Sequence, residues 1–453
     1  MEKCGTFVSL SGRRPRTIII MRGIRDSATV IRTTTTRTIQ IQYVPFGILH
    51  KNHLFFSVMD IKYDVPIEDV FSAYYDCRKH KRNKIGALNF EVDLENNLIQ
   101  LWKDLRTANY KILPSTVFIV EKPVKREIFA ANFRDRIVHH LLLMYLNPYF
   151  EKHFIYDSYS CRVGKGTHFG IKRVNHFIHK CSENGKSKCW ILKLDVQSFF
   201  MSIDKRILYK RLIDFVNFYY REENIEFVKY LINEIIWNNP VTNCIFHSSK
   251  SKWNDLKFGK SLFDVDSNHG LPIGNYTSQV FANFYLSQLD HYIKHDKKIE
   301  FYGRYVDDFV IVHKSKIVLK KLILEINDLL KQNLGLKLNP QKIYLQPFCN
   351  GVRFLGFFIK QNHIVANHRI YKNFSESIRK NNLLVKNHKP SKEERTHFIS
   401  SVNSYLGILK HYKTYKIRSK ILKNKISDLW FKQISIYGKS EKIIKHTNGG
   451  SSK

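Results

Sequence analysis

Two adjacent carboxylates inside an apolar, strand-like segment constrain this chain more than any other feature of its sequence. The segment "FYGRYVDDFVIVHKS", residues 301–315, places Asp307 and Asp308 between two apolar runs. Burying an ionised carboxylate costs several kcal/mol unless a counter-charge or a metal ion compensates for it. The segment therefore requires a partner elsewhere in the fold.

We predict that this partner is Asp195. In the segment "ILKLDVQSFFMSID", an apolar strand precedes Asp195 and a turn follows it. Asp195 lies about 110 residues before Asp307 and Asp308 in the sequence. Strands that far apart in sequence can lie side by side in one sheet. Carboxylate oxygens suit Mg²⁺, and two such ions about 3.5–4 Å apart can clamp the attacking and leaving oxygens of a phosphoryl transfer. A lone pair of aspartates would also fit a turn or an exposed edge, but the second strand favours a metal site.

The order of periodic segments predicts an α+β fold. Apolar residues recur at helical spacing in "PIEDVFSAYYDCRKHKR" and "LENNLIQLWKDLRTANY". Strand-like segments follow, namely "STVFIVEKP", "CWILKLDVQSFF", "RYVDDFVIVH" and "VRFLGFFI". This arrangement indicates an antiparallel sheet that carries the carboxylates. After Asn367 the sequence predicts a mostly helical and very basic region.

The charge balance favours a polyanionic partner. Lys and Arg number 75 against 39 Asp and Glu, a formal net charge of +36. A generally basic composition without such a partner is the alternative. The seven cysteines form no CxxC pair, and no apolar run reaches the roughly 18 residues of a membrane span. We therefore expect reduced thiols, a cytoplasmic protein of a bacterium or a phage-infected cell, and no membrane or signal segment.

An ordered set of motifs resembles the reverse transcriptase family. "YVDD" at residues 305–308 resembles its catalytic hairpin, and "LKLDVQSFFMSID" its first metal motif. "GLPIGNYTSQVFANFYLSQLD", "LGLKLNPQKIYL" and "VRFLGFFI" follow in the family's order, and "RDRIVHHLLLMYLNPYFEKHFIYDSYSCRVGKGTH" resembles the fingers of bacterial retroelement enzymes. The resemblance covers about residues 60–415. It implies a right-hand polymerase fold with fingers, palm and helical thumb, and DNA synthesis on RNA with two Mg²⁺ ions, for which Mn²⁺ can substitute.

The same resemblance implies roles for individual residues. Asp195, Asp307 and Asp308 would be catalytic and would bind the metal together with Val196, Asp308 being the less direct ligand. Lys342 would protonate the departing pyrophosphate, unless it is a surface lysine. The residues expected at the incoming nucleotide are Lys122, Lys125, Arg126, Phe199, Phe200, Ile273 and Gly274. Those expected at the template and primer are Ser278, Gln279, Tyr305, Leu355 and Gly356.

Some of these residues have plainer interpretations. Phe200 stands where the family excludes a ribose 2′-hydroxyl, but one of Phe199 and Phe200 is expected to be ordinary core. The lysines and arginine of "EKPVKRE" would hold triphosphate charge, or would form a solvated turn. Gly356 would allow a tight turn at the primer grip.

One departure from the common family pattern points to a subclass. Many members carry Gln where this chain has Ile273, and "PIGN-T-SQ" resembles reverse transcriptases of diversity-generating retroelements. These enzymes copy a template-repeat RNA with errors at adenines, and the product rewrites a target gene. The resemblance also implies a small basic accessory protein that forms a ring. A retron or phage-defence reverse transcriptase is the alternative, and a non-catalytic RNA-binding scaffold is the alternative outside enzymes.

Five segments are expected along the chain. Residues 1–58 differ in composition from the rest of the chain. Their run "RTTTTRTIQIQ" becomes Asn-rich when Thr codons are read one base earlier. We interpret them as upstream template sequence translated out of frame, with Met59 as the start, or else as a disordered Thr-rich arm. The further segments are 59–187 (N-terminal helices and fingers), 188–365 (palm, with an insertion near 240–268), 366–440 (thumb) and 441–453 (flexible tail).

Overall fold

The computed structural model describes residues 27–33, 39–45, 61–79, 81, 83–121, 124–257, 259–361 and 363–445. The chain divides into two compact units, residues 1–112 and 113–453. No helix within the described ranges combines the length and the apolar character that a bilayer crossing requires.

The first unit contains a β-hairpin followed by three helices. Strand β1 (Ser27–Thr33) pairs antiparallel with β2 (Ile39–Pro45). The rest of residues 1–58 lies outside the described part, so the out-of-frame interpretation of this segment stays a prediction. Helices α1 (Ile67–Arg78), α2 (Ile85–Glu91) and α3 (Leu94–Arg106) follow, and α1 and α3 confirm the two helices predicted from the sequence.

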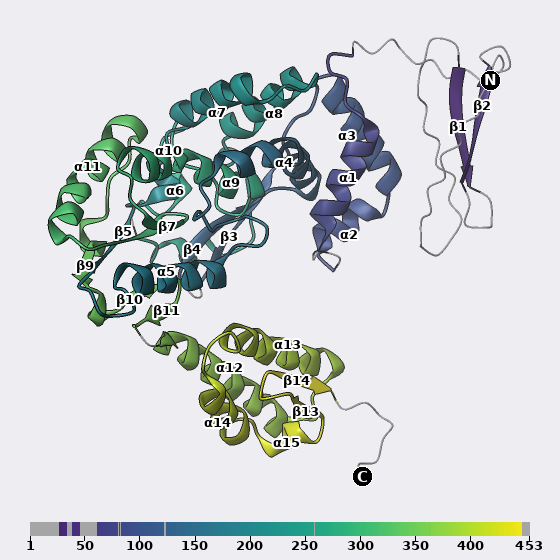
Figure 1. Ribbon diagram of the computed structural model, residues 1–453. Coiled ribbons are helices and arrows are strands. Elements are labelled where there is room, and N and C mark those ends of the chain that lie inside the picture. The colour runs from purple at the N-terminus through teal and green to yellow at the C-terminus, as the bar shows by residue number, and fades with distance from the viewer. Residues whose placement is uncertain are drawn as a thin grey trace. The chain divides into compact units, whose positions relative to one another are not determined.

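A four-stranded antiparallel sheet forms the centre of the second unit (Figure 1). Its order is β7-β8-β5-β9. The strands are β7 (Phe301–Tyr305), β8 (Asp308–His313), β5 (Trp190–Asp195) and β9 (Tyr344–Pro347). The expected antiparallel sheet with the carboxylates on neighbouring strands is thereby confirmed.

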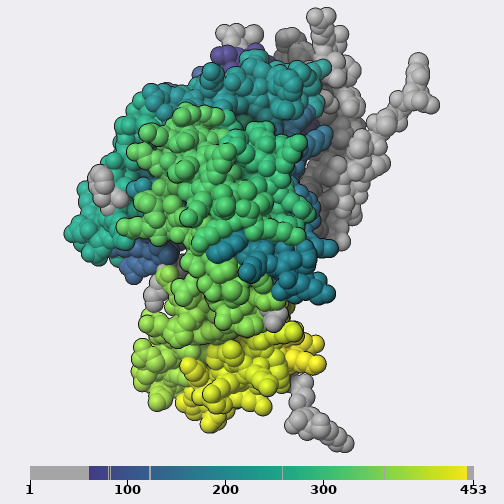
Figure 2. Space-filling view, turned by 60° about the vertical axis from the view of Figure 1, so that its left-hand side comes forward, coloured from purple at the N-terminus to yellow at the C-terminus, as the bar shows by residue number. Residues whose placement is uncertain are grey.

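Helices cover this central sheet. The apolar side chains of α5 (Thr167–Cys181) share one core cluster with Ile191, Val310 and Val312 of the sheet. Around the sheet lie α4 (Phe133–His153), α9 (Tyr276–Tyr285), α10 (Ser287–His291) and α11 (Lys316–Leu334). Figure 2 turns the side that carries α11 towards the viewer, as part of the green surface. The charged ends of β5 and β8 thus rest on a well-packed framework.

A second sheet, which we call the fingers sheet, consists of β3 (Ser115–Val120), β4 (Arg126–Ala130) and β6 (Cys244–Phe246). β3 pairs antiparallel with β4 and parallel with β6. Because β6 comes from residues 240–268, the segment expected as an insertion in the palm contributes a strand to the fingers sheet.

A buried carboxylate holds that segment against β4. Glu127 is only 1% exposed and accepts hydrogen bonds from Trp253 Nε1 (2.6 Å), Ser261 Oγ (2.7 Å) and the Leu262 backbone N–H (2.7 Å). Three donors compensate for its desolvation. Glu127 therefore ties three points of residues 240–268 to the fingers sheet.

The remaining elements complete the unit. Before the central hairpin lie α6 (Phe199–Ser202), α7 (Lys205–Tyr219) and α8 (Ile225–Trp237). A small antiparallel sheet follows β9, made of β10 (Val352–Phe354), β11 (Phe357–Ile359) and β12 (Ile364–Ala366).

The region after Asn367 confirms the expected helices, which are α12 (His368–Asn387), α13 (Lys392–Leu409), α14 (Tyr415–Lys425) and α15 (Asp428–Phe431). It also contains an antiparallel pair that the sequence did not predict, β13 (Ile434–Tyr437) and β14 (Lys442–Lys445). Within the segment 441–453 expected as a flexible tail, residues 442–445 form β14, and residues 446–453 lie outside the described residues.

The Glu127 anchor yields a stability prediction. We expect Glu127→Gln to lower the free energy of unfolding by about 1–3 kcal/mol, because an amide cannot accept from all three buried donors. Glu121→Gln is the matched control, since the exposed ion pair between Glu121 and Lys252 (3.0 Å) is worth about 0–1 kcal/mol. Denaturant unfolding followed by circular dichroism measures both. Equal shifts for the two variants would contradict the anchoring role.

Candidate active site

Three carboxylates meet at one end of the central sheet. Asp195 ends β5 and stands directly opposite Asp308, which begins β8. Asp307 lies in the two-residue turn between β7 and β8, next to Val306. Residues directly opposite in an antiparallel pair project to the same face. The predicted juxtaposition of the two carboxylate-bearing strands is confirmed.

The protein environment opposes full ionisation of this cluster. Burial raises the pKa of Asp308 to about 7, and the charges of Asp307 and Asp195 add to the increase while Lys193 opposes it. Burial also raises the pKa of Asp307 and repulsion from Asp195 adds to the increase, while a backbone hydrogen bond and the charges of Lys342 and Lys260 oppose it. Desolvation by burial, with repulsion between neighbouring like charges added to it, accounts for both shifts.

Two lysines supply the nearest positive charge. Lys342, at the end of the short helix η5 (Pro340–Lys342), places its Nζ 2.8 and 2.9 Å from Oδ1 and Oδ2 of Asp195. Lys193 Nζ lies 3.1 Å from Asp308 Oδ2. The sequence analysis selected Lys342 but missed Lys193. The sequence feature that could have identified Lys193 was its position two residues before Asp195 on the same strand, which places both side chains on one face.

The residues fit a divalent cation in charge and donor chemistry. Asp308 Oδ1 is buried without a hydrogen-bond partner, as a ligand oxygen would be in the absence of its ion. Within the described ranges, however, no three His, Cys, Asp or Glu side chains are placed to hold a metal together. A cation at Asp195 would have to displace the Lys342 ammonium from its oxygens.

Val196, the fourth predicted metal ligand, directly follows β5. The Asp195 carbonyl accepts from the Asn339 N–H (2.8 Å), and the Gln197 N–H donates to the Lys337 carbonyl (2.9 Å). Because backbone groups alternate in direction along a strand, the Val196 carbonyl points away from residues 337–339. It is therefore directed towards the edge of β5 that faces β8.

Two residues predicted at the nucleotide lie on one small apolar cluster. Its buried members are Val117, Phe129, Met201 and Leu262. Phe200 and Ile273 are partly buried and pack against it. Phe199, 2% exposed, is the core member of the Phe199–Phe200 pair. The structure thus brings Phe200 and Ile273 together on the surface of one cluster.

Gly274 is required where it stands. Its φ is +136°, and a Cβ added there would lie 2.5 Å from the Phe129 carbonyl oxygen. The Phe129 N–H donates to the Ile273 carbonyl (2.8 Å). Only glycine tolerates this conformation and this approach together, so the segment that carries Ile273 is fixed to β4.

The predicted fingers cations are only partly described. Lys125 pairs with Asp255 at 3.3 Å, and Asp255 belongs to residues 240–268. Arg126 begins β4. Lys122 lies outside the described residues. The predicted role of these three cations at a triphosphate stays a prediction.

The residues predicted at template and primer occupy three places. On α9, Ser278 is buried and Gln279 is exposed, and Gln279 Oε1 accepts from Cys161 Sγ (2.9 Å). Tyr305 ends β7 directly opposite Asp308. Leu355 and Gly356 form the turn between β10 and β11, with φ values of +48° and +85°. The expected tight turn at Gly356 is confirmed, whereas the roles of these residues stay predictions.

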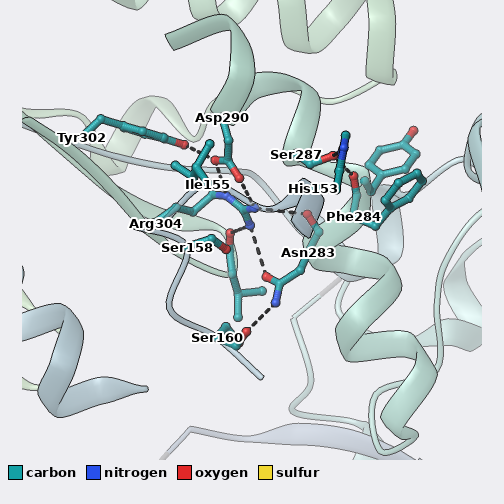
Figure 3. Close-up of polar contacts among 12 residues, drawn as sticks. His153, Ile155, Ser158, Ser160, Asn283, Phe284, Ser287, Asp290, Tyr302 and Arg304 are labelled. Carbon is teal, nitrogen blue, oxygen red and sulfur yellow. Dashed lines mark hydrogen bonds and ion pairs between the residues drawn. The ribbon is translucent and has the colours of Figure 1, made fainter. Parts of the chain in front are cut away.

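A buried ion pair beneath the carboxylates was not predicted. Arg304 on β7 and Asp290 on α10 are both fully buried, and Arg304 Nη2 lies 2.5 Å from Asp290 Oδ2 (Figure 3). The sequence feature that could have indicated this ion pair was the charge of Arg304, two positions from Tyr302 in a strand that otherwise carries no charge.

A family model described as reverse transcriptase (RNA-dependent DNA polymerase) matches residues 121–359, just over half of the chain. The match covers the central sheet, strands β4 and β6 of the fingers sheet, all three carboxylates and Lys342. Together with the central antiparallel sheet, it confirms the expected α+β right-hand polymerase fold.

Two curated relatives align with much of this chain. The COX1/OXI3 intron 2 protein of Saccharomyces cerevisiae is 27% identical over 326 residues, which are 64% of this chain and 37% of the yeast protein. Protein YkfC of Escherichia coli is 25% identical over 297 residues, 57% of this chain and 70% of YkfC. The chain thus spans little more than a third of the yeast relative.

Solved structures of telomerase also align. Apo telomerase from Candida tropicalis has a TM-score of 0.42 at 12% identity, covering 68% of this chain and 55% of that chain. Telomerase from Candida albicans, in complex with a fragment of telomeric RNA, has a TM-score of 0.38 at 14% identity, covering 72% and 59%.

The Lys342–Asp195 contact predicts competition between the lysine and a metal. We expect Lys342→Met to tighten Mn²⁺ binding by about fivefold, equivalent to about 1 kcal/mol for a half-exposed ion pair. Electron paramagnetic resonance of free Mn²⁺ during titration measures the affinity. Lys331→Met, on the exposed side of α11, is the control. Unchanged affinity in Lys342→Met would show that the pair does not compete with the ion.

Proposed function

The chain belongs to the reverse transcriptase family, and from that premise we propose that it is an active RNA-directed DNA polymerase. The observation that carries the proposal is the register of the central sheet, which sets Asp195 opposite Asp308 with Asp307 in the adjoining turn. A carboxylate cluster in which the pKa values of Asp307 and Asp308 are both raised is a costly arrangement, and metal-dependent catalysis gives a reason for it.

Asp195 and Asp307 hold the metal in this proposal, with the Val196 carbonyl as a further ligand and Asp308 as the outer carboxylate. When bound, Mg²⁺ lowers the pKa of the primer 3′-hydroxyl and neutralises triphosphate charge. With a cation bound, Lys342 would be released from Asp195 and would donate a proton to the departing pyrophosphate. Its contact with Asp195 supports this role, because the ammonium already lies at the reacting centre.

The incoming nucleotide is held on the open side of the apolar cluster, close to the fingers sheet that contributes Val117 and Phe129 to it. Lys125 and Arg126 at the start of β4, together with Lys122, attract the triphosphate. Phe200 excludes the ribose 2′-hydroxyl and thereby selects deoxynucleotides, while Phe199 supports it from the core. The partly buried position of Phe200 supports this division of roles, because a residue that contacts substrate must keep an open face.

Template and primer bind along α9 and the β10–β11 turn. Gln279 and Ser278 lie on the template side, and Tyr305, Leu355 and Gly356 support the primer end. The formal net charge of +36 supports binding of an RNA–DNA duplex through its phosphates.

The finer proposal is that the enzyme serves a diversity-generating retroelement. In this role it copies a template-repeat RNA with errors at adenines, and the cDNA diversifies a target gene by mutagenic retrohoming in the cytoplasm of a bacterium or infected cell. A small basic ring-forming accessory protein is the expected partner. Ile273 supports this choice over a retron or phage-defence enzyme, because an apolar residue replaces a hydrogen-bonding one beside the nucleotide.

Loss of one metal-binding carboxylate tests the polymerase proposal. We expect Asp307→Asn or Asp195→Asn to abolish primer extension on an RNA template with Mg²⁺, because each removes an anionic ligand. RNA binding, measured by filter retention, should remain. Asp328→Asn, on the exposed side of α11, is the matched control. Near-normal extension by either site variant would refute the assignment, and absence of extension in the unaltered protein would favour an RNA-binding scaffold.

Substitution at Ile273 tests the subclass. An apolar pocket discriminates between substrates by only about 1–3 kcal/mol, whereas a hydrogen-bonding site can do far better. We therefore expect Ile273→Gln to lower the error rate opposite template adenines more than it lowers total synthesis. Sequencing of cDNA made from a mixed-base RNA template, with any accessory protein present, measures both quantities.

Val241→Gln is the control for this experiment, since Val241 packs on the same cluster in residues 240–268. Uniformly low error at all four template bases in the unaltered enzyme would instead favour the retron or phage-defence alternative.

A further inference from the structure

The turn that carries Asp307 has a backbone conformation that its first residue disfavours. Val306 has φ +56°, in the left-handed region. A β-branched residue is a genuine outlier there, because its Cβ substituents crowd the backbone. The turn therefore does not keep this conformation by local preference alone, and something outside it must hold it.

Arg304 supplies a contact that can hold the turn. Its Nη1 donates a hydrogen bond to the Val306 carbonyl at 2.9 Å. Arg304 stands one position from Tyr305, and alternate strand residues project to opposite faces. Its side chain therefore lies beneath the sheet, on the face opposite the Asp308 carboxylate. From there it reaches the turn without entering the space in front of the carboxylates.

The guanidinium is itself fixed from two helices (Figure 3). Arg304 Nε donates to Asp290 Oδ1 (2.7 Å) and Nη2 to Asp290 Oδ2 (2.5 Å) on α10. Nη2 also donates to the Asn283 carbonyl of α9 (3.1 Å). The Tyr302 hydroxyl completes the network by donating to Asp290 Oδ1 (2.6 Å). A planar fork with both ends engaged has little freedom to rotate.

We propose that Arg304 is a positioning residue for catalysis, which fixes the conformation of Val306 and thereby the placement of Asp307 and Asp308 opposite Asp195. Asp290 acts through it by orienting the guanidinium. The proposal rests on the polymerase function proposed above. It adds to that function a hydrogen-bonded network on the buried face of the sheet, which sets the geometry of the carboxylates on the other face.

A purely structural ion pair would not need this geometry. The pairing with Asp290 uses Nε and Nη2, so the Nη1 bond to Val306 is additional to the charge pair. A lysine at position 304 keeps the positive charge beside Asp290, but its single ammonium cannot also span the distance to the turn. Arg304→Lys therefore separates the positioning role from the charge balance of the core.

The test combines this substitution with relief of the strain. We expect Arg304→Lys to lower kcat for primer extension by about ten- to a hundredfold, to raise the Mg²⁺ concentration for half-maximal rate, and to change KM for deoxynucleotide far less. Adding Val306→Gly should restore most of the lost rate, because glycine adopts a positive φ unaided. Val306→Gly alone supplies the reference rate against which the double variant is compared.

Controls keep the outcomes distinct. Arg211→Lys removes a partly buried guanidinium that donates to the Tyr285 carbonyl (2.6 Å) of α9, and we expect no rescue of that variant by Val306→Gly. If Arg304→Lys fails to fold by circular dichroism, Arg304→Met with Asp290→Leu removes the ion pair without leaving a buried charge, and the same rescue is expected.

A double variant that remains as slow as Arg304→Lys would overturn the positioning role while leaving the polymerase assignment intact. Failure of the polymerase proposal itself would appear separately, as activity that survives Asp307→Asn.

Discussion

The antiparallel pairing of β5 with β8 is the constraint on which the rest of the site depends. It sets Asp195 directly opposite Asp308, and the turn before β8 adds the charge of Asp307. Three carboxylates this close repel one another, and partial burial strengthens the repulsion because the surrounding dielectric is low. Lys193 reduces that repulsion by pairing with Asp308, and Lys342 reduces it by pairing with Asp195. The carboxylates make this end of the sheet attract cations, and the two ammonium groups already lie there.

The two-residue period of the strands lets one sheet carry both a reactive face and a rigid one. Asp308 and Tyr305 project to one face of the hairpin, while Tyr302 and Arg304 project to the other and are fully buried. The buried face therefore bonds to α9 and α10 without competing for space with substrates. This separation explains how a charged and strained turn can be held in one conformation from behind.

The sequence was informative where a local pattern determines the structure. Carboxylates at the ends of apolar, strand-like segments predicted β5 and β8 as neighbours, and the positive φ of Gly356 matched its expected turn. Lys193, Arg304 and Glu127 were missed because their meaning depends on partners more than ten residues away. The strand β6 was missed for a similar reason, since a three-residue strand has too little periodicity and only its pairing with β3 defines it.

The position of Ile273 follows from a backbone constraint more than from its own side chain. Gly274 lets the chain approach Phe129 so closely that Ile273 is fixed against β4, and the same cluster carries Phe200. The two side chains proposed to select base and sugar therefore rest on one small apolar support. A polar residue at 273 would have to keep its hydrogen-bonding groups on the open side of that support, because an unsatisfied polar atom within the cluster is costly. Because the support is shared, a substitution that displaces it would alter base selection and sugar selection together, whereas a change confined to the open face would alter only one.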